Sequence, residues 1–190
     1  LTALVRLLVR NREALAGLEG GAALLRRPLD RLFALLRRNS RAGSRRNIAD
    51  HNDLGNDFFA LMLDQTMTYS SGVFERPDST LEEASVRKLD LLCRRLALQP
   101  GDHLLEIGTG WGSLALHAAG RYGCRVTTTT LSRAQGELAR ERVARAGLSD
   151  RITLLQADYR DLRGRFDKLV SCEMIEAIGA AQYGTFFARC

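Results

Sequence analysis

This sequence of 190 residues contains little proline and lacks long uncharged apolar runs. No run of about 18 uncharged apolar residues occurs, which is the length that a membrane-spanning helix requires. Only three prolines are present, so a proline-rich linker or stalk is excluded. Hydrophobic residues make up 45% and charged residues 26%, a balance typical of a globular protein and not of a disordered one.

The four cysteines, Cys93, Cys124, Cys172 and Cys190, show no zinc-ligand or redox spacing. Each lies in an apolar run, which predicts small buried thiols. With no signal peptide visible, this usage favours the reducing cytosol. The chain begins with Leu1 in place of Met, and Cys190 ends an apolar stretch, so we expect a fragment cut at both ends.

Charge is concentrated at the start of the chain. Residues 1–50 hold 11 Lys and Arg against 4 Asp and Glu, a net charge of +7. Residues 51–190 hold 17 and 18, a net charge of −1, and the two sum to the overall +6. The basic character therefore belongs to an extension, where anionic lipid is one partner that it would meet and a solvated helix face is the alternative.

Residues 1–40 are predicted to be helical, because leucines recur at helical spacing at Leu25, Leu29, Leu32 and Leu36. Arginines lie off that stripe, so the segment suits either a membrane surface or packing against its own domain. Residues 39–50 are polar, basic and aperiodic, which indicates a linker. No aromatic residue lies among these arginines, so we predict no nucleic-acid partner.

Residues 51–102 are predicted to form a helical cover over an active site. Residues 51–75 mix aromatic and small polar residues, a composition that suits the wall of a site. Thr80 and Glu83 form a capping-box pattern that predicts the start of a helix. Its inward positions are predicted to be Leu81, Leu89, Leu92 and Leu96.

Residues 103–190 alternate strand and helix, which predicts a parallel α/β sheet of Rossmann-like type. Helices are expected at 112–122 and 132–146, the second opened by a capping box from Ser132 to Gln135 and ended by Gly147. Short apolar or β-branched runs predict strands at 103–107, 125–130, 152–156 and 168–172. Four strands are fewer than a doubly wound sheet normally has, so we expect an incomplete domain.

The segment that follows the first strand carries a chemical signal. It runs from Glu106 to Gly112 with glycines at 108, 110 and 112, which allow a sharp turn and a close approach to a ligand. The following helix start offers free N–H groups to an anionic group, and Glu106 can accept from an ammonium or hydroxyl. The third glycine comes one residue too early for the dinucleotide fingerprint. The pattern instead resembles the S-adenosylmethionine loop of class I methyltransferases.

Two further segments follow strands at the same edge of the predicted sheet, where open α/β sheets bind ligands. Residues 130–135 come after the second strand, and Gln135 either contacts the ligand or closes the capping box of its helix. Asp158 comes after the third strand, where it either accepts from an adenine amino group or caps a turn.

The stretch 51–187 resembles the cyclopropane-fatty-acyl-phospholipid synthases and the related mycolic acid cyclopropane synthases. The resemblance rests on motifs at 51–59, 68–74, 105–112, 130–132 and 173–179. It implies methyl transfer from S-adenosylmethionine to a cis double bond in an unsaturated phospholipid acyl chain. The resulting carbocation then loses a proton, and in the family a bound bicarbonate is the base. It also implies a protein at the cytoplasmic face of the membrane, touching lipid through its basic N-terminal segment, with a homodimer as one option for its assembly.

The resemblance also assigns roles to individual residues. Glu176 and Ser71 are the expected catalytic residues, with Glu176 helping to hold bicarbonate. Glu176 is an acid inside the apolar run from Met174 to Ile178, which predicts a buried functional role, with an exposed helix face as the alternative. The expected cofactor contacts are Tyr69, Ser70, Leu105, Glu106, Gly108, Gly110, Trp111, Gly112, Thr130, Leu131, Ser132, Gln135, Asp158 and Tyr159. No metal site is expected.

Two positions depart from the family pattern. Ser71 stands where the family usually has cysteine, and Ala177 where it usually has histidine. Both changes fall at the bicarbonate site, so methyl transfer is a firmer expectation than ring closure. A methyl-branched or methylene product, a soluble methyl acceptor, and a non-catalytic lipid- or cofactor-binding homologue are the alternatives.

Overall fold

The computed structural model describes residues 6, 7, 9–12 and 55–190. The chain divides into two units, Leu1–Gly43 and Ser44–Cys190, and only the second is described over most of its length. The linker predicted at 39–50, the start of the motif at 51–59 and most of the helical segment predicted at 1–40 lie outside the described residues.

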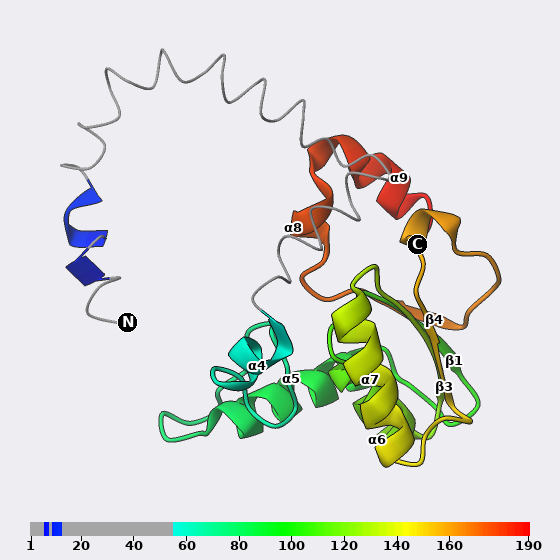
Figure 1. Cartoon of the computed structure of the whole chain (residues 1–190), viewed down its shortest axis with the longest axis horizontal. Coiled ribbons are helices and arrows are strands. Elements are labelled where there is room, and N and C mark those ends of the chain that lie inside the picture. The colour runs from blue at the N-terminus through cyan, green and yellow to red at the C-terminus, as the bar shows by residue number, and fades with distance from the viewer. Residues whose placement is uncertain (1–5, 8, 13–54) are drawn as a thin grey trace. The chain divides into compact units, whose positions relative to one another are not determined.

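Four parallel strands form the sheet in the order β3-β2-β1-β4 (Figure 1). Their bounds are His103–Ile107 for β1, Arg125–Thr129 for β2, Ile152–Leu155 for β3 and Lys168–Val170 for β4. This confirms the predicted parallel α/β sheet. The bounds of β1 are as predicted, whereas the other three strands end one or two residues earlier than predicted.

Three longer helices connect and cover these strands: α5 (Leu81–Arg95), α6 (Ser113–Tyr122) and α7 (Arg133–Arg145). The capping box at Thr80 and Glu83 is present, as predicted. Leu81, however, is exposed, because it opens the helix ahead of the first inward turn at Ala84 and Ser85.

The second capping box is only half formed. The Ser132 hydroxyl accepts from the Gln135 backbone N–H at 3.3 Å, as predicted. The capping-box pattern predicts that the Gln135 side chain accepts a bond from the Ser132 backbone N–H. That N–H donates instead to Thr130 Oγ1 at 3.1 Å. Gly147 follows the helix with φ +67°, which agrees with its predicted role as a terminator.

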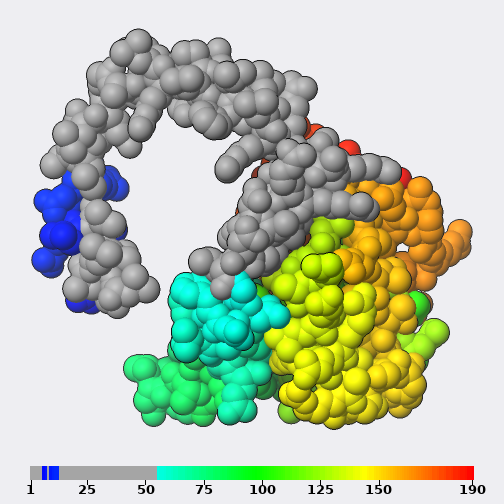
Figure 2. All heavy atoms as spheres, in the orientation of Figure 1, coloured from blue at the N-terminus to red at the C-terminus, as the bar shows by residue number. Residues whose placement is uncertain are grey.

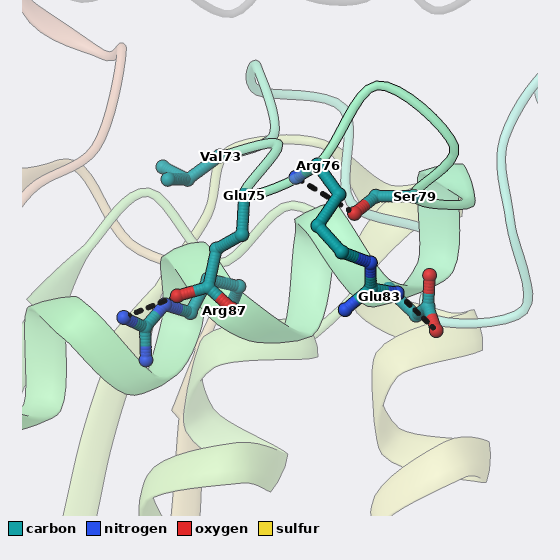
Figure 3. A pocket seen from close by; sticks show the side chains of 6 residues that line it. All are labelled: Val73, Glu75, Arg76, Ser79, Glu83 and Arg87. Atoms are coloured by element: carbon teal, nitrogen blue, oxygen red, sulfur yellow. Dashed lines mark hydrogen bonds and ion pairs between the residues drawn. The ribbon is translucent and has the colours of Figure 1, made fainter.

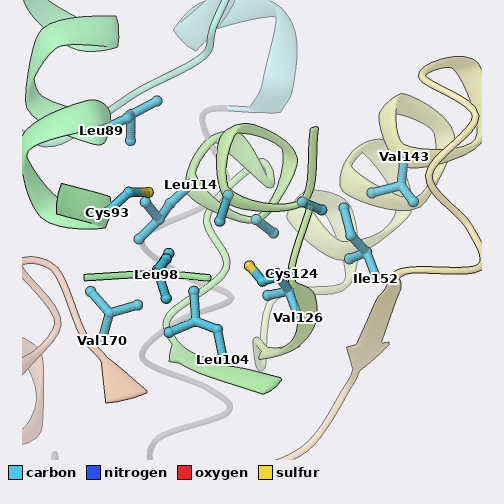
Figure 4. Packing of buried hydrophobic residues seen from close by; sticks show 13 residues of the cluster. Leu89, Cys93, Leu98, Leu104, Leu114, Cys124, Val126, Val143, Ile152 and Val170 are labelled. Carbon is cyan, nitrogen blue, oxygen red and sulfur yellow. The ribbon is translucent and has the colours of Figure 1, made fainter. Parts of the chain in front are cut away.

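The larger hydrophobic core lies between one face of the sheet and the helices (Figure 4). Because side chains alternate along a strand, Leu104 faces this core and Leu105 faces the other side. The four strands contribute Leu104, Val126, Ile152 and Val170, and the helices contribute Leu89, Cys93, Leu114 and Val143 among others. Burying each such leucine or valine stabilises the fold by about 1.5–3 kcal/mol.

A smaller cluster covers the opposite face of the sheet. Leu105 and Ile107 pack there with Tyr159, Ile178 and Phe186. These three come from the short elements η1 (Tyr159–Asp161), α8 (Ile175–Ile178) and α9 (Tyr183–Phe187), the last preceded by η2 (Ala180–Gln182).

Helix α4 (Gly55–Ala60) packs beside α7, and Figure 2 shows its cyan surface against the yellow surface of that helix. Across residues 55–190 no helix has the length and apolarity needed to cross a bilayer. Cys93 and Cys124 are buried, as predicted, while Cys172 is half-buried and Cys190 is exposed. The burial prediction is therefore wrong for Cys190, since the last turn of the chain packs through Phe186 instead.

Candidate functional site

The loop after β1 turns back on itself at the carboxyl edge of the sheet. The N–H groups of Gly108 and Thr109 both donate to the Thr129 carbonyl, at 3.1 and 3.0 Å. The three glycines have φ of +105°, +52° and +85°, values that side-chain-bearing residues rarely adopt. Gly112 caps α6 without a side-chain bond, so the first N–H groups of that helix face the loop.

Glu106 ends β1 beneath this loop and is only 4% exposed. The Thr128 hydroxyl donates to its Oε2 at 2.6 Å, and the Thr109 hydroxyl lies 2.7 Å from that of Thr128. Burial raises the pKa of Glu106 to about 8, against the opposing effects of the Thr128 bond and the Lys88 charge. The carboxyl group therefore holds a proton more readily than an exposed glutamate does.

Trp111 anchors the cover to the loop. Its side chain is 1% exposed, and its indole N–H donates to Asn56 Oδ1 at 2.8 Å. Asn56 in turn donates to the Ala134 carbonyl at 3.2 Å, joining α4 to α7. The ring centroids of Phe59 and Tyr69 lie 4.9 and 6.3 Å from that of Trp111, so the aromatic residues of the cover pack beside the residue that follows Gly110 in the loop.

Arg142 on α7 links the glycine loop to the segment that precedes Tyr69. Its guanidinium donates to the carbonyls of Trp111 at 2.6 Å and Thr66 at 2.8 Å. The Ser113 hydroxyl also donates to the Thr66 carbonyl, at 2.5 Å. Burial lowers the pKa of Arg142 from its usual value. The segment before Tyr69 is therefore fixed against the loop by charge-assisted bonds.

The segments after β2 and β3 lie at the same edge as the loop. Thr130 and Ser132 are buried, and Leu131 and Gln135 are half-buried. Asp158 is buried and accepts from the backbone N–H of Arg160 at 3.0 Å and from its guanidinium at 2.8 and 2.5 Å. The turn-capping interpretation of Asp158 is therefore confirmed, and an adenine contact would share this carboxylate with Arg160.

A second group of side chains meets at the carboxyl end of β4. Lys88 of α5 is 8% exposed; its ammonium group donates to the Ser70 hydroxyl and lies 4.0 Å from Cys172 Sγ. One residue further along both segments, Glu173 Oε1 accepts from the Ser71 N–H at 3.2 Å and from the Ser71 hydroxyl at 3.1 Å. Residues 70–71 and 172–173 are thus joined by two successive contacts.

Glu176 is exposed on α8, so the prediction that it is buried is wrong for this structure. The helix turns Ile178 into the small core. Two residues correspond to about 200° of helical rotation, so Glu176 points to roughly the opposite side. Ala177 is exposed beside it.

The sequence interpretation missed Asn56, Lys88, Arg142 and Glu173. Asn56 and Glu173 lie inside motifs that carried the family resemblance but were assigned no role. Lys88 was detectable, because it lies four residues before Leu92 on the predicted inward face of its helix. No comparable pattern marks Arg142.

A separate pocket of about 130 Å³ lies where the start of α5 meets the preceding loop (Figure 3). It is lined by Val73, Glu75, Arg76, Ser79, Glu83 and Arg87. Its charges are already paired, Arg87 with Glu75 at 2.5 Å and Arg76 with Glu83 at 3.8 Å. None of the predicted site residues lines it, so it is not part of the candidate site.

Comparison with known proteins places these features in a family. The sequence profile described as mycolic acid cyclopropane synthetase matches residues 39–190. The tuberculostearic acid methyltransferase UfaA1 of Mycobacterium tuberculosis is 47% identical over 157 residues, covering 79% of this chain and 36% of its own. The cyclopropane-fatty-acyl-phospholipid synthase of Escherichia coli is 44% identical over 139 residues, covering 73% and 35%.

Solved structures agree with this placement. The mycolic acid cyclopropane synthase CmaA1, in complex with SAH and CTAB, aligns with a TM-score of 0.73 at 38% identity, covering 76% of this chain and 51% of that one. Coclaurine N-methyltransferase aligns with a TM-score of 0.59 at 31% identity, covering 63% and 35%. The chain thus spans about a third to a half of the proteins that it matches. Its sheet and helices are those of the class I methyltransferase fold, and the chain belongs to the mycolic acid cyclopropane synthetase family.

Proposed function

We propose that the protein transfers a methyl or methylene group from S-adenosylmethionine to the cis double bond of an unsaturated phospholipid acyl chain. The observation that carries the proposal is the glycine loop after β1, with three positive φ angles and an aromatic cover from Phe59 and Tyr69. The family match over residues 39–190 supports it. The SAH in the CmaA1 structure is the demethylated form of the proposed donor.

The bound donor would supply a methyl group made electrophilic by its sulfonium sulfur. Residues of the loop would hold it, with N–H groups at the start of α6 toward its carboxylate and Glu106 toward its ammonium group. Tyr69 and Ser70 would close over it from the cover. The remaining contacts are proposed at Leu105, Gly108, Gly110, Trp111, Gly112, Thr130, Leu131, Ser132, Gln135, Asp158 and Tyr159. Aligning a weakly nucleophilic alkene with the methyl group is the main catalytic contribution expected of such a site.

A lipid acceptor is supported by apolar side chains around the cover. Leu61, Met62 and Phe74 are 85%, 51% and 56% exposed, and they flank the segment that carries Tyr69. Exposed apolar side chains close in sequence to a proposed site are candidates for contact with an acyl chain. The names of the E. coli and M. tuberculosis relatives, a fatty-acyl-phospholipid synthase and a tuberculostearic acid methyltransferase, point to the same class of acceptor.

The proposal includes the division into a basic extension at 1–50, a cover at 51–102 and a cofactor-binding domain from 103. The extension, with 11 basic residues, would contact anionic lipid at the cytoplasmic face of the membrane. Reversing the charge of Arg37, Arg38, Arg45 and Arg46 should weaken binding to anionic vesicles, and unchanged vesicle affinity would place the membrane contact elsewhere. Homodimer formation stays part of this proposal and is tested by sedimentation.

The deciding experiment incubates the full-length protein with unsaturated phospholipid vesicles and methyl-trideuterated S-adenosylmethionine, followed by mass spectrometry of the lipids. Products that keep two deuterium atoms would mean that a methyl proton was lost, as in a cyclopropane or a methylene group. Products that keep all three would mean a methyl branch, and the name of the relative UfaA1, a tuberculostearic acid methyltransferase, favours testing for it. Unlabelled lipid with retained donor binding would favour a soluble acceptor or a non-catalytic homologue.

A further inference from the structure

Glu173 accepts both hydrogen bonds donated by Ser71, the residue that the family resemblance places at the bicarbonate site. We propose that the Glu173 carboxylate takes the place of that ion and serves as the built-in proton acceptor of the reaction. The inference rests on the proposed function, because it assigns a residue to the proton-loss step of that chemistry. It starts from the two bonds that Ser71 donates to Glu173 Oε1, at 3.2 and 3.1 Å.

The two segments that carry this contact are fixed at the reaction end of the fold. Lys88 bridges Ser70 and Cys172, the residues immediately before Ser71 and Glu173. Met174 packs on the glycine loop, since a Cβ built on Gly108 would lie 3.4 Å from Met174 Cβ. Glu173 therefore lies between the loop proposed to hold the methyl donor and the Tyr69–Ser71 segment that covers it.

The backbone of Glu173 supports a functional role. Its φ is +51°, in the left-handed region that glycine adopts without strain. A residue that bears a side chain is strained in this region, and such outliers gather at functional sites. Glu173 is exposed, so core packing does not account for this strain. The conformation does aim the carboxylate at Ser71.

Bicarbonate itself fits these residues poorly. Ser71 has two donors near this point, and both are used by Glu173. A second anion would meet the Glu173 carboxylate, and two negative charges in contact repel each other. Ala177 supplies no donor where the family usually has histidine. The site thus already holds an oxyanion that belongs to the chain.

The proposed step is a simple proton transfer. When the alkene attacks the methyl carbon, a carbon–carbon bond forms and the electron pair of the breaking carbon–sulfur bond leaves with sulfur. Glu173 then accepts a proton from the transferred methyl group, and the electron pair of the broken C–H bond closes the ring onto the cationic carbon. Both bonds that Glu173 accepts from Ser71 go to Oε1, and among the described residues Oε2 accepts none. Oε2 is the oxygen that would take the proton.

The test compares Glu173→Gln, which keeps size and loses charge, and Glu173→Gly, which removes the side chain and relieves the positive φ. The matched control is Glu137→Gln on α7, an exposed glutamate outside the site. Full-length proteins are assayed with labelled donor and vesicles in carbonate-depleted buffer. We expect the unaltered protein and the control to work without carbonate, and Glu173→Gln to lose about 100-fold or more of its turnover. Adding bicarbonate or formate should partly restore Glu173→Gly.

A second readout does not depend on turnover. Each SAH-saturated protein is titrated with sodium bicarbonate in a calorimeter. We expect binding to Glu173→Gly and none to the unaltered protein. Bicarbonate binding to the unaltered protein, a carbonate requirement for its activity, or turnover of Glu173→Gln within about threefold of it would each overturn the inference. If the unaltered protein labels no lipid in any buffer, the proposed function and the proton transfer both fail, and calorimetry alone decides whether Glu173 fills the anion site.

Discussion

The loop after β1 and the segment after β4 lie at the same edge of the sheet but are held in different ways. The loop is buried, with Trp111 and Glu106 almost without exposure and its backbone bonded to Thr129. The segment after β4 exposes Glu173 and Glu176 and is joined to the cover through Ser71 and Lys88. The donor end of the proposed site is thus part of the core, whereas the proton-accepting end depends on a few side-chain contacts.

Among the tests of the buried loop region, the largest expected change in unfolding free energy comes from Glu106. Its pKa in the fold is about 8, above the usual 4.5, so the folded state keeps a proton that the unfolded state releases as pH rises between these values. The free energy of unfolding should fall across this window, in total by about 3–5 kcal/mol at 1.4 kcal/mol per pH unit. The stabilisation is complete below pH 4.5 and lost above about pH 8. Glu106→Gln should remove this slope.

Urea unfolding of both proteins over that pH window measures the difference. His103 and His117 contribute the opposite slope, because burial lowers their pKa values from 6.5 and the unfolded state binds their protons more tightly. They are common to both proteins, so subtracting the two curves isolates Glu106. Parallel curves for the two proteins would contradict the prediction.

Gly112→Ala should cause the next largest loss of folding free energy. The new Cβ would lie 3.3 Å from Ala139 Cβ, at a φ of +85°. Backbone strain and overpacking together should cost about 2–4 kcal/mol of folding free energy. Affinity for SAH, measured by calorimetry, should fall about 100-fold, because N–H groups at the start of α6 would shift.

Gly147→Ala is the matched control for backbone strain. Its φ is +67°, but a Cβ there meets nothing within 4 Å. It should cost only about 1 kcal/mol and leave SAH affinity unchanged. Equal losses of affinity in the two variants would show that general destabilisation, and not the loop, controls binding.

The sequence predicted features that depend on neighbouring residues and missed contacts between residues far apart in the chain. The bounds of β1 and the capping box at Thr80 depend on residues close in the chain, and local patterns found them. The partners of Lys88, Asn56 and Glu173 lie 18, 55 and 102 residues away, and no local pattern encodes such pairs. The fold and the glycine loop were therefore predictable, and the contacts at the end of β4 were not.

Glu176 shows the limit of an argument from composition. An acid within an apolar run predicted burial, but α8 is a helix of only four residues that buries Ile178 alone. Asp158 shows a related limit. The sequence offered a ligand contact or a turn cap for this residue, and only the fold shows that its carboxylate accepts from the backbone N–H and the guanidinium of Arg160.

Lys88→Met tests the contact that joins the two regions. The ammonium group donates to Ser70, approaches Cys172 and opposes the high pKa of Glu106. Replacing it should cost about 2 kcal/mol, the range for hydrogen bonds to charged groups. Without this contact the segment after β4 should open more often, so the half-buried Cys172 should be alkylated faster. The alkylation rate is measured by peptide mass spectrometry.

Arg95→Met is the control on the same helix, since Arg95 is an exposed cation at the end of α5. Its stability and the alkylation rate of Cys172 should stay within about 0.5 kcal/mol and twofold of the unaltered protein. An equal response to both substitutions would mean that charge on α5, and not the buried contact, holds the segment.

Removing one hydroxyl from each region gives the sharpest form of the comparison, and one of the two changes is expected to have a very small effect. Thr128→Val would leave the buried Glu106 without its 2.6 Å donor, which should cost about 1–3 kcal/mol. Ser71→Ala removes a donor of similar geometry at 3.1 Å, yet Ser71 is exposed, water replaces the lost bond, and its backbone N–H still reaches Glu173. We expect less than about 0.5 kcal/mol there by urea unfolding. Equal losses of unfolding free energy in the two variants would mean that the segment after β4 is as much a part of the core as the loop. A much smaller loss for Ser71→Ala would mean that side chains in this segment can be substituted at little cost in stability. Serine in place of the family's usual cysteine at position 71 would then be tolerated for that reason.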